Sequence, residues 1–313
     1  MNDLAIWTEK LVKTYPGVTA VDGLSLNVPR GVAYGFLGRN GAGKTTTIRI
    51  LLGLAKPTEG RATILGFSAG REQVAILERT AFVSESKTLY GHLTPRELVR
   101  FTRGFYPKWS DQAVAKYSRL FEIPMGRPFS KLSQGNRTKV YLLLALSQGA
   151  DLLILDEPGM GLDPVVVDEF LRILVEDVIG EGRTVFISSH QLADVEQIAD
   201  WVGLIDHGRL LLEARLDDIK SQFRWVTVAG NALPQTKSPE VLLAASEGNF
   251  YKYLVTKNAD AFAAELGRQG ATVVEVSPLG LREIFLALVR KEEPCTSGNV
   301  GEIAAPVSSS FCS

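Results

Sequence analysis

The stretch from Gly38 to Thr45 constrains this chain more than any other. It reads GRNGAGKT, with two glycines, a lysine and a threonine in the pattern Gly-x4-Gly-Lys-Thr. The apolar run Val32–Leu37 before it is typical of a strand, and a helix is predicted over about 44–52. Glycines let successive backbone N–H groups turn toward one anion, and the helix N-terminus adds a favourable dipole. The stretch therefore predicts a nucleotide site, and this context disfavours the alternative of a simple glycine-rich turn.

The charged and hydroxyl side chains of this loop have separate expected roles. Lys44 supplies a point charge for the β- and γ-phosphates, and the Thr45 hydroxyl can bind Mg²⁺. The candidate nucleotide-binding residues of the loop are Gly38, Arg39, Asn40, Gly41, Ala42, Gly43, Lys44, Thr45 and Thr46.

Two adjacent carboxylates follow a second buried strand. The run Leu152–Leu155 is continuously apolar and is followed by Asp156 and Glu157. In open parallel sheets ligands bind beyond the carboxyl ends of the strands, where these side chains emerge. Asp156 is expected to hold Mg²⁺ through water, and Glu157 to polarise the attacking water as general base. The alternative is an acidic strand end that merely caps a turn, and the phosphate loop favours the catalytic interpretation.

A histidine ends the strand TVFISSH at the same predicted edge. A neutral imidazole at His190 could bridge a γ-phosphate and Glu157. A histidine at a strand end is more often simply packed or exposed. The catalytic interpretation of His190 therefore depends on the nearby phosphate loop and carboxylates.

The pattern of strands and helices predicts an α/β fold with helices on both faces of the sheet. Residues 4–13 and 21–28 alternate as a hairpin-like strand pair would, and a helical insert is predicted over about 88–150. The main domain is expected over 1–215. A small α+β module is expected over 216–291, and the polar tail 292–313 is expected to be disordered.

Composition excludes several classes of protein. The net charge of −1 gives no electrostatic argument for nucleic acid as a partner. No apolar run reaches the roughly 20 residues that a membrane-spanning helix needs. Both cysteines, Cys295 and Cys312, lie in the polar tail, which suits a reducing compartment.

Five motifs in order carry a family resemblance. GRNGAGKT, LSQGN at 132–136, LLILDEP, GLD at 161–163 and His190 together resemble the ATP-binding subunit of an ABC transporter, over about residues 4–215. The resemblance implies a P-loop NTPase core of the ABC ATPase type with an antiparallel β subdomain and a helical subdomain. It also implies ATP and Mg²⁺ as cofactors.

The resemblance assigns further residues by position. Tyr15 resembles the aromatic residue that stacks on adenine, with an ordinary turn tyrosine as the alternative. Ser133 and Gly135 would contact ATP bound to a second copy of the chain, and Asp163 would link the two sites. Two half-sites in one chain favour a head-to-tail dimer that encloses two ATPs.

Two positions depart from the family pattern. The common signature is LSGGQ, and Gln134 and Asn136 here replace its first glycine and its last glutamine. The loop that usually offers a glutamine to Mg²⁺ has Glu85 at that position, so Glu85 is a candidate metal ligand.

The resemblance predicts an Mg²⁺-dependent ATPase that powers a separate membrane permease. It would act as a peripheral subunit at the cytoplasmic face of the cell membrane, without nucleic acid. The small C-terminal module resembles that of drug, antibiotic and sodium exporters, which favours export; a packing addition is the alternative for the module. The functional alternatives are a soluble ABC-type ATPase and a regulatory nucleotide-binding module.

Overall fold

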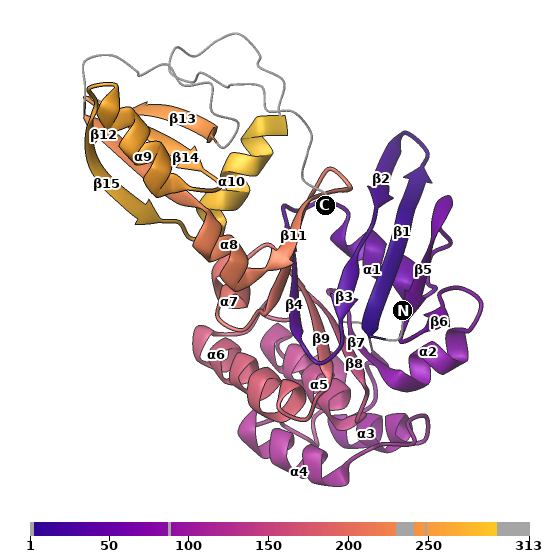
Figure 1. The fold of residues 1–313 in the computed structure, drawn as a ribbon. Coiled ribbons are helices and arrows are strands. Elements are labelled where there is room, and N and C mark those ends of the chain that lie inside the picture. Colours follow the sequence, from indigo (N-terminus) through magenta and orange to yellow (C-terminus); the bar gives the residue numbers. More distant parts are fainter. Residues whose placement is uncertain (1–2, 87–88, 230–240, 248, 293–313) are drawn as a thin grey trace. The chain divides into compact units, whose positions relative to one another are not determined.

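The computed structural model describes residues 3–86, 89–229, 241–247 and 249–292. The chain divides into two compact units, Met1–Glu213 and Ala214–Ser313 (Figure 1). The tail predicted to be disordered lies, beyond residue 292, outside the described residues. In the part of the chain that the structure describes, no helix is both long and apolar enough to cross a membrane.

A six-stranded sheet is the centre of the first unit, with the strand order β11-β10-β4-β9-β8-β7 (Figure 1). Its neighbours from β10 to β7 are parallel, so their carboxyl ends meet at one edge. Every residue of β4, β8 and β9 is buried, which explains their apolar runs. The strands are β4 (Ala33–Gly38), β7 (Thr80–Val83), β8 (Leu152–Asp156), β9 (Thr184–Ser189), β10 (Trp201–Asp206) and β11 (Arg209–Arg215).

An antiparallel sheet forms a second layer and differs from prediction at one strand. Its strands are β1 (Leu4–Tyr15), β2 (Val18–Leu24), β3 (Asn27–Pro29), β5 (Glu59–Ile64) and β6 (Phe67–Ser68). The single strand expected over 21–28 is two strands, which pair with different halves of β1. The buried Thr8 hydroxyl donates to the Leu24 carbonyl and accepts from the Leu26 N–H, at 3.0 and 2.8 Å. The Thr8 side chain thus supplies hydrogen-bond partners to the backbone groups between β2 and β3.

Four helices of the first unit, α3 to α6, begin at residues whose side chains cap them. Thr94 and Glu97 form a capping box, and Ser110, Ser133 and Asp163 each accept a backbone N–H as N-cap. The helices are α1 (Lys44–Leu51), α2 (Gln73–Arg79), α3 (Pro95–Arg103), α4 (Asp111–Leu120), the 3-10 turn η1 (Phe129–Lys131), α5 (Gln134–Ser147), α6 (Pro164–Ile173), the π-helical segment η2 (Leu174–Ile179) and α7 (Leu192–Glu196).

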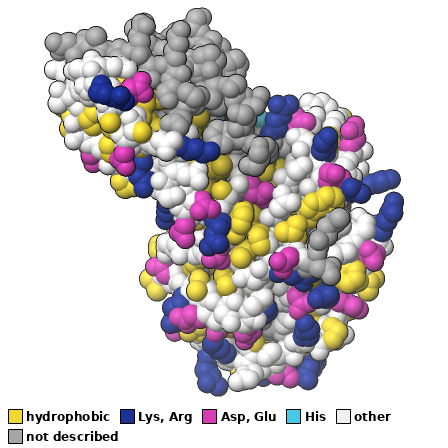
Figure 2. All heavy atoms as spheres, viewed as in Figure 1, with side chains coloured by type: hydrophobic (Ala, Val, Ile, Leu, Met, Phe, Trp, Pro, Cys, Tyr) yellow, Lys and Arg dark blue, Asp and Glu magenta, His cyan; other side chains and the backbone are white. Residues whose placement is uncertain are grey.

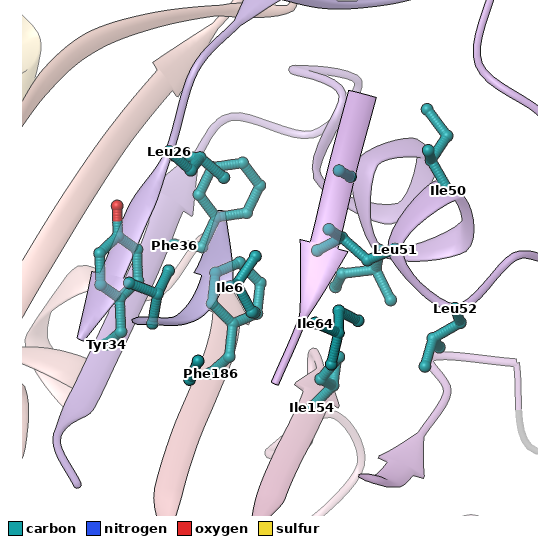
Figure 3. Packing of buried hydrophobic residues seen from close by; sticks show 14 of the residues in the cluster. Ile6, Leu26, Tyr34, Phe36, Ile50, Leu51, Leu52, Ile64, Ile154 and Phe186 are labelled. Atoms are coloured by element: carbon teal, nitrogen blue, oxygen red, sulfur yellow. The ribbon is translucent and has the colours of Figure 1, made fainter. Parts of the chain in front are cut away.

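A core between the two sheets holds α1 in place (Figure 3). It combines Ile6 and Ile64 from the antiparallel sheet, Leu51 from α1, and Phe36 and Phe186 from the central sheet. Burying each such side chain contributes about 1.5–3 kcal/mol. The N-terminus of α1, where the phosphate loop ends, is therefore fixed against both layers.

The second unit has its own sheet and core. Its sheet has the order β13-β14-β12-β15 with antiparallel pairs, and its core includes Val226, Tyr253 and Phe262. Strand β13 was not predicted from the sequence. The elements are α8 (Leu216–Gln222), β12 (Arg224–Ala229), β13 (Val241–Glu247), β14 (Phe250–Val255), α9 (Ala259–Arg268), β15 (Thr272–Pro278) and α10 (Leu281–Glu292).

Candidate active site

The phosphate loop joins the buried strand β4 to α1, and its shape depends on glycine. Gly41 and Gly43 have φ values of 82° and 105°, a region that other residues avoid. A Cβ at Gly43 would also lie 2.3 Å from the carbonyl oxygen of Ala20. From the other side, the Gly208 N–H donates to the Ala42 carbonyl at 2.9 Å. The loop is therefore held between β2 and the turn that follows β10.

Lys44 is almost fully buried at the start of α1. Its Nζ donates to the carbonyl oxygens of Gly38 and Arg39, at 2.7 and 3.2 Å. The same Nζ lies 3.4 Å from Oε1 of Glu157. The ammonium group is thus positioned inside the loop and beside the predicted base, as a phosphate-binding lysine requires.

Two of the three residues predicted to bind Mg²⁺, Thr45 and Asp156, are in direct contact. The Thr45 hydroxyl donates to Oδ2 of Asp156 at 2.9 Å, and Oδ1 accepts from the Ser188 hydroxyl at 2.5 Å. Among the described residues no group of three or more His, Cys, Asp or Glu side chains could hold a metal. Mg²⁺ commonly binds through one or two protein ligands, substrate phosphates and water, so this hydroxyl–carboxylate pair fits such an ion.

Glu157 is held in an unusual backbone conformation. Its φ is +49°, which is rare for a residue with a side chain and concentrates at functional sites. One carboxylate oxygen, Oε2, lies 2.8 Å from Nδ1 of His190. The other, Oε1, is buried and has no hydrogen-bond partner, although it faces Lys44. Glu157 is thus oriented by His190 through one oxygen, while the other oxygen faces the Lys44 ammonium.

A cavity of about 360 Å³ collects residues from the phosphate loop, Glu157 and His190, whereas Asp156 does not line it. Glu85 also lines it, although in sequence Glu85 lies far from the loop and from Glu157. The lining residues are Ala20, Asn40, Gly41, Gly43, Lys44, Thr45, Thr46, Glu85, Glu157, Met160 and His190.

A second cavity, of about 500 Å³, shares Asn40, Glu157, Met160 and His190 with the first. Asp168 and Asp194 also line it. Burial and the nearby Asp168 carboxylate raise the pKa of Asp194 above its usual range. The candidate site is therefore continuous, at His190, with a cavity that two further carboxyl groups line.

The residues expected to contact adenine or a second copy of the chain lie outside the 360 Å³ cavity. Tyr15 is partly exposed at the end of β1, with Lys13 Nζ 4.9 Å from its ring centroid. Ser133 and Asp163 act as N-caps of α5 and α6. Gly135 lies against the backbone of Gly161, where a Cβ would be 2.9 Å from the carbonyl oxygen. Their predicted contacts with ATP remain predictions.

Sequence reasoning missed three residues of the site. Ser188 is the parallel neighbour of Asp156 near the end of β9, and His190 follows that strand directly. Its position two residues before His190 in the sequence could have predicted that Ser188 belongs to the site. Ala20 and Met160 offered no such signal, because folding alone brings them to the loop.

Comparisons with known proteins agree with this geometry. Residues 21–159 match the family model described as ABC transporter. The bacitracin transport ATP-binding protein of Bacillus licheniformis is 40% identical over 222 residues, which cover 70% of this chain and 72% of that protein. The daunorubicin/doxorubicin resistance ATP-binding protein of Streptomyces peucetius is 36% identical, over 69% of this chain and 67% of that protein.

Solved structures show the same fold. An ATP-binding subunit of an ABC transporter has a TM-score of 0.62 and 28% identity, and the match covers 69% of this chain and 92% of that one. A dimeric ATP-binding cassette in a post-hydrolysis state with ADP and Pi has a TM-score of 0.60 at 21% identity, covering 67% and 98%. The predicted family and fold are confirmed. The chain belongs to the ABC transporter family as an ATP-binding subunit with ATPase activity.

Proposed function

We propose that two copies of this chain close around two ATPs and power a separate membrane permease, with export as the direction of transport. The chain would act at the cytoplasmic face of the membrane as a peripheral subunit. The relatives support this assignment, because they are named for bacitracin transport and for daunorubicin/doxorubicin resistance.

The side chains of the site divide the chemistry of hydrolysis. Lys44 neutralises charge on the β- and γ-phosphates, with its position set by the carbonyls of Gly38 and Arg39. Thr45 and Asp156 would hold Mg²⁺, which when bound supplies further positive charge to the phosphates. Glu157 accepts a proton from the attacking water. His190 orients the Glu157 carboxylate through the 2.8 Å contact.

One observation carries the hydrolytic assignment. Glu157 Oε1 is buried without a hydrogen-bond partner while Oε2 is held by His190. The Lys44 ammonium 3.4 Å away offsets part of the cost of burying this oxygen, and a hydrogen-bond donor would offset the rest. A water molecule bound there and aimed at the γ-phosphate would satisfy it, which is the arrangement a general base needs.

The dimer gives a role to the predicted residues at the helix starts and at the end of β1. Ser133 and Gly135 belong to a helix start, which favours an anion through its dipole and N–H groups. They would contact ATP held by the phosphate loop of the second copy, with Asp163 linking the two sites and Tyr15 stacking on adenine.

An exposed aromatic cluster on the helical subdomain supports a permease partner. Tyr90, Phe101 and Phe105 are 57%, 49% and 62% exposed. Their rings pack edge to face, with centroids 5.7 and 5.2 Å apart along the series. Exposed apolar clusters of this kind mark protein interfaces. In this family the helical subdomain is where the membrane partner docks.

The face of the first unit drawn in Figure 2 carries charges of both signs and gives no argument for nucleic acid as a partner. On that face, Lys and Arg side chains alternate with Asp and Glu over the described residues. Nucleic-acid binding requires a basic stripe or patch.

The proposal is tested by the solution mass of Glu157→Gln with and without ATP and Mg²⁺. Without the base, ATP should bind but persist, so the closed dimer should accumulate. Lys44→Ala is the matched control, since it removes phosphate binding and should remain monomeric. Equal hydrolysis rates in Glu157→Gln and the wild-type chain would contradict the catalytic assignment, and a monomer that binds ATP would contradict the dimer.

A further inference from the structure

Gln134, where the family has glycine, lies across the loop that follows the catalytic pair. A Cβ at Gly161 would lie 3.0 Å from Cγ of Gln134, 3.1 Å from Cδ and 3.2 Å from Nε2. The three nearest atoms to that point all belong to Gln134. Gln134 is otherwise exposed to solvent, so its side chain packs only on the side that faces Gly161.

Two further contacts join the first turn of α5 to the same loop. The hydroxyl of the fully buried Thr138 lies 3.1 Å from the Gln134 carbonyl oxygen and 3.3 Å from the Met160 carbonyl oxygen, so its one proton is shared between a bond within α5 and one to this loop. Gly135 approaches the Gly161 carbonyl so closely that a Cβ would lie 2.9 Å away. The helix start and residues 160–161 therefore form one packed unit within a single chain.

The loop connects directly to the base and to the next helix. The Met160 N–H donates to the Glu157 carbonyl at 3.2 Å, and Asp163 caps α6 through the Val166 N–H at 3.0 Å. A shift of Gly161 is thus transmitted over a few residues to Glu157 on one side and Asp163 on the other.

We propose that Gln134 is a positioning residue that couples the two ATP sites of the dimer, an inference that rests on the proposed function. Its helix start faces ATP of the second copy, while the loop beneath its side chain leads to the base for the chain's own ATP. Engagement of one ATP by the turn that contains Gln134 presses on Gly161 and sets the position of Glu157 at the other ATP.

The contact itself is tested by a double-mutant cycle in thermal unfolding. Gly161→Ala introduces backbone strain in every background, because φ of Gly161 is +81°. In the wild-type background the new methyl group also meets the Gln134 side chain, which Gln134→Ala removes. We expect Gly161→Ala to lower Tm by about 2–4 °C more in the wild-type background than in the Gln134→Ala background. Equal losses in both backgrounds would overturn the contact.

The coupling is tested by the ATP dependence of hydrolysis in the full chain. The wild-type Hill coefficient should exceed unity, and Gln134→Ala should bring it toward unity while ATP binding to the monomer is unchanged. Gln134→Met, which retains the length of the side chain, should restore cooperativity. Gln112→Ala is the matched control, since Gln112 is also an exposed glutamine in the first turn of a serine-capped helix.

Equal Hill coefficients in Gln134→Ala and the wild-type chain, or a wild-type coefficient of unity, would overturn the coupling. Neither result touches the proposed function, which fails separately if Glu157→Gln forms no dimer with ATP. A dimer in Glu157→Gln that is unaffected by Gln134→Ala, together with unchanged cooperativity, would leave the function in place and remove the role of Gln134.

Discussion

At the scale of single residues, the site depends on buried polar groups that satisfy one another. Asp156 is fully buried, and its two oxygens accept from Thr45 and Ser188. A buried carboxylate is tolerated only with such donors. The Ser188 hydroxyl therefore orients the carboxylate that would hold Mg²⁺, although it would not touch the ion itself.

Ser188→Ala should destabilise the first unit and raise the Mg²⁺ concentration needed for hydrolysis. It leaves Oδ1 of Asp156 without its donor, at a cost of about 1–3 kcal/mol. Urea unfolding and an Mg²⁺ titration of ATPase activity measure the two effects. Ser189→Ala is the control on the adjacent residue of β9, and its Mg²⁺ dependence should match the wild-type chain. Identical titrations for both variants would contradict the orienting role.

Glu85→Gln should weaken the response to Mg²⁺. Glu85 lines the cavity with Thr45, so its charge attracts a cation there. Loss of an interaction on the order of 1 kcal/mol corresponds to about 5-fold in the half-saturating Mg²⁺ concentration. ATPase assays over a range of Mg²⁺ measure the shift, with Glu78→Gln on the exposed face of α2 as control. An unchanged titration would show that Glu85 is not near the ion.

At the scale of elements, ion pairs connect α2 and the helical subdomain to the start of β8 in the central sheet. Asp151, just before β8, accepts from Arg79 at the end of α2 and from Lys108 before α4, both at 2.6 Å. Burial raises the pKa of Asp151, but these hydrogen bonds and charges outweigh it and hold the pKa below its usual range. The pairs thus favour the charged carboxylate in the folded state.

Asp151→Asn should reduce stability near neutral pH but not in acid. A carboxyl group with a lowered folded pKa stabilises above its unfolded pKa of about 3.9, and the contribution is lost as pH falls through the folded value. For pairs this exposed we expect about 0.5–1 kcal/mol at pH 7. Urea unfolding from pH 7 down to pH 3 should show the gap between the two chains narrowing below about pH 4. A gap that persists in acid would contradict the ion-pair explanation.

At the scale of the whole molecule, two units have separate hydrophobic cores. One core surrounds α1 between the two sheets of the first unit, and the other lies on the four-stranded sheet of the second unit. The residues that line the nucleotide cavity all belong to the first unit. Ligand binding should therefore stabilise the two units unequally.

ATP with Mg²⁺ should raise the unfolding temperature of the first unit only. A ligand at 100 times its Kd stabilises the state that binds it by about 2.7 kcal/mol. Calorimetry of Glu157→Gln, with and without ATP and Mg²⁺, should show one transition that shifts and one that does not. Lys44→Ala should abolish the shift. An equal shift of both transitions would contradict separate stability of the units.

The sequence by itself determined the features that depend on neighbouring residues. The phosphate loop is contiguous from Gly38 to Thr45, and helix starts such as Ser133 and Asp163 are set by a side chain and the N–H three residues later. Strands β4, β8 and β9 of the parallel sheet followed from their apolar runs, whereas β7 was not predicted. Strand β13 and the break between β2 and β3 escaped prediction because pairing partners, and not local pattern, decide them.

Only the tertiary structure decided how the distant residues meet. Thr45 reaches Asp156 across 111 positions, and His190 reaches Glu157 across 33, because β4, β9 and β8 end at one edge of the sheet. The positive φ of Glu157 is likewise invisible in the sequence. Local propensity acts over a few residues, whereas a catalytic site needs groups that only packing of the whole unit can hold together.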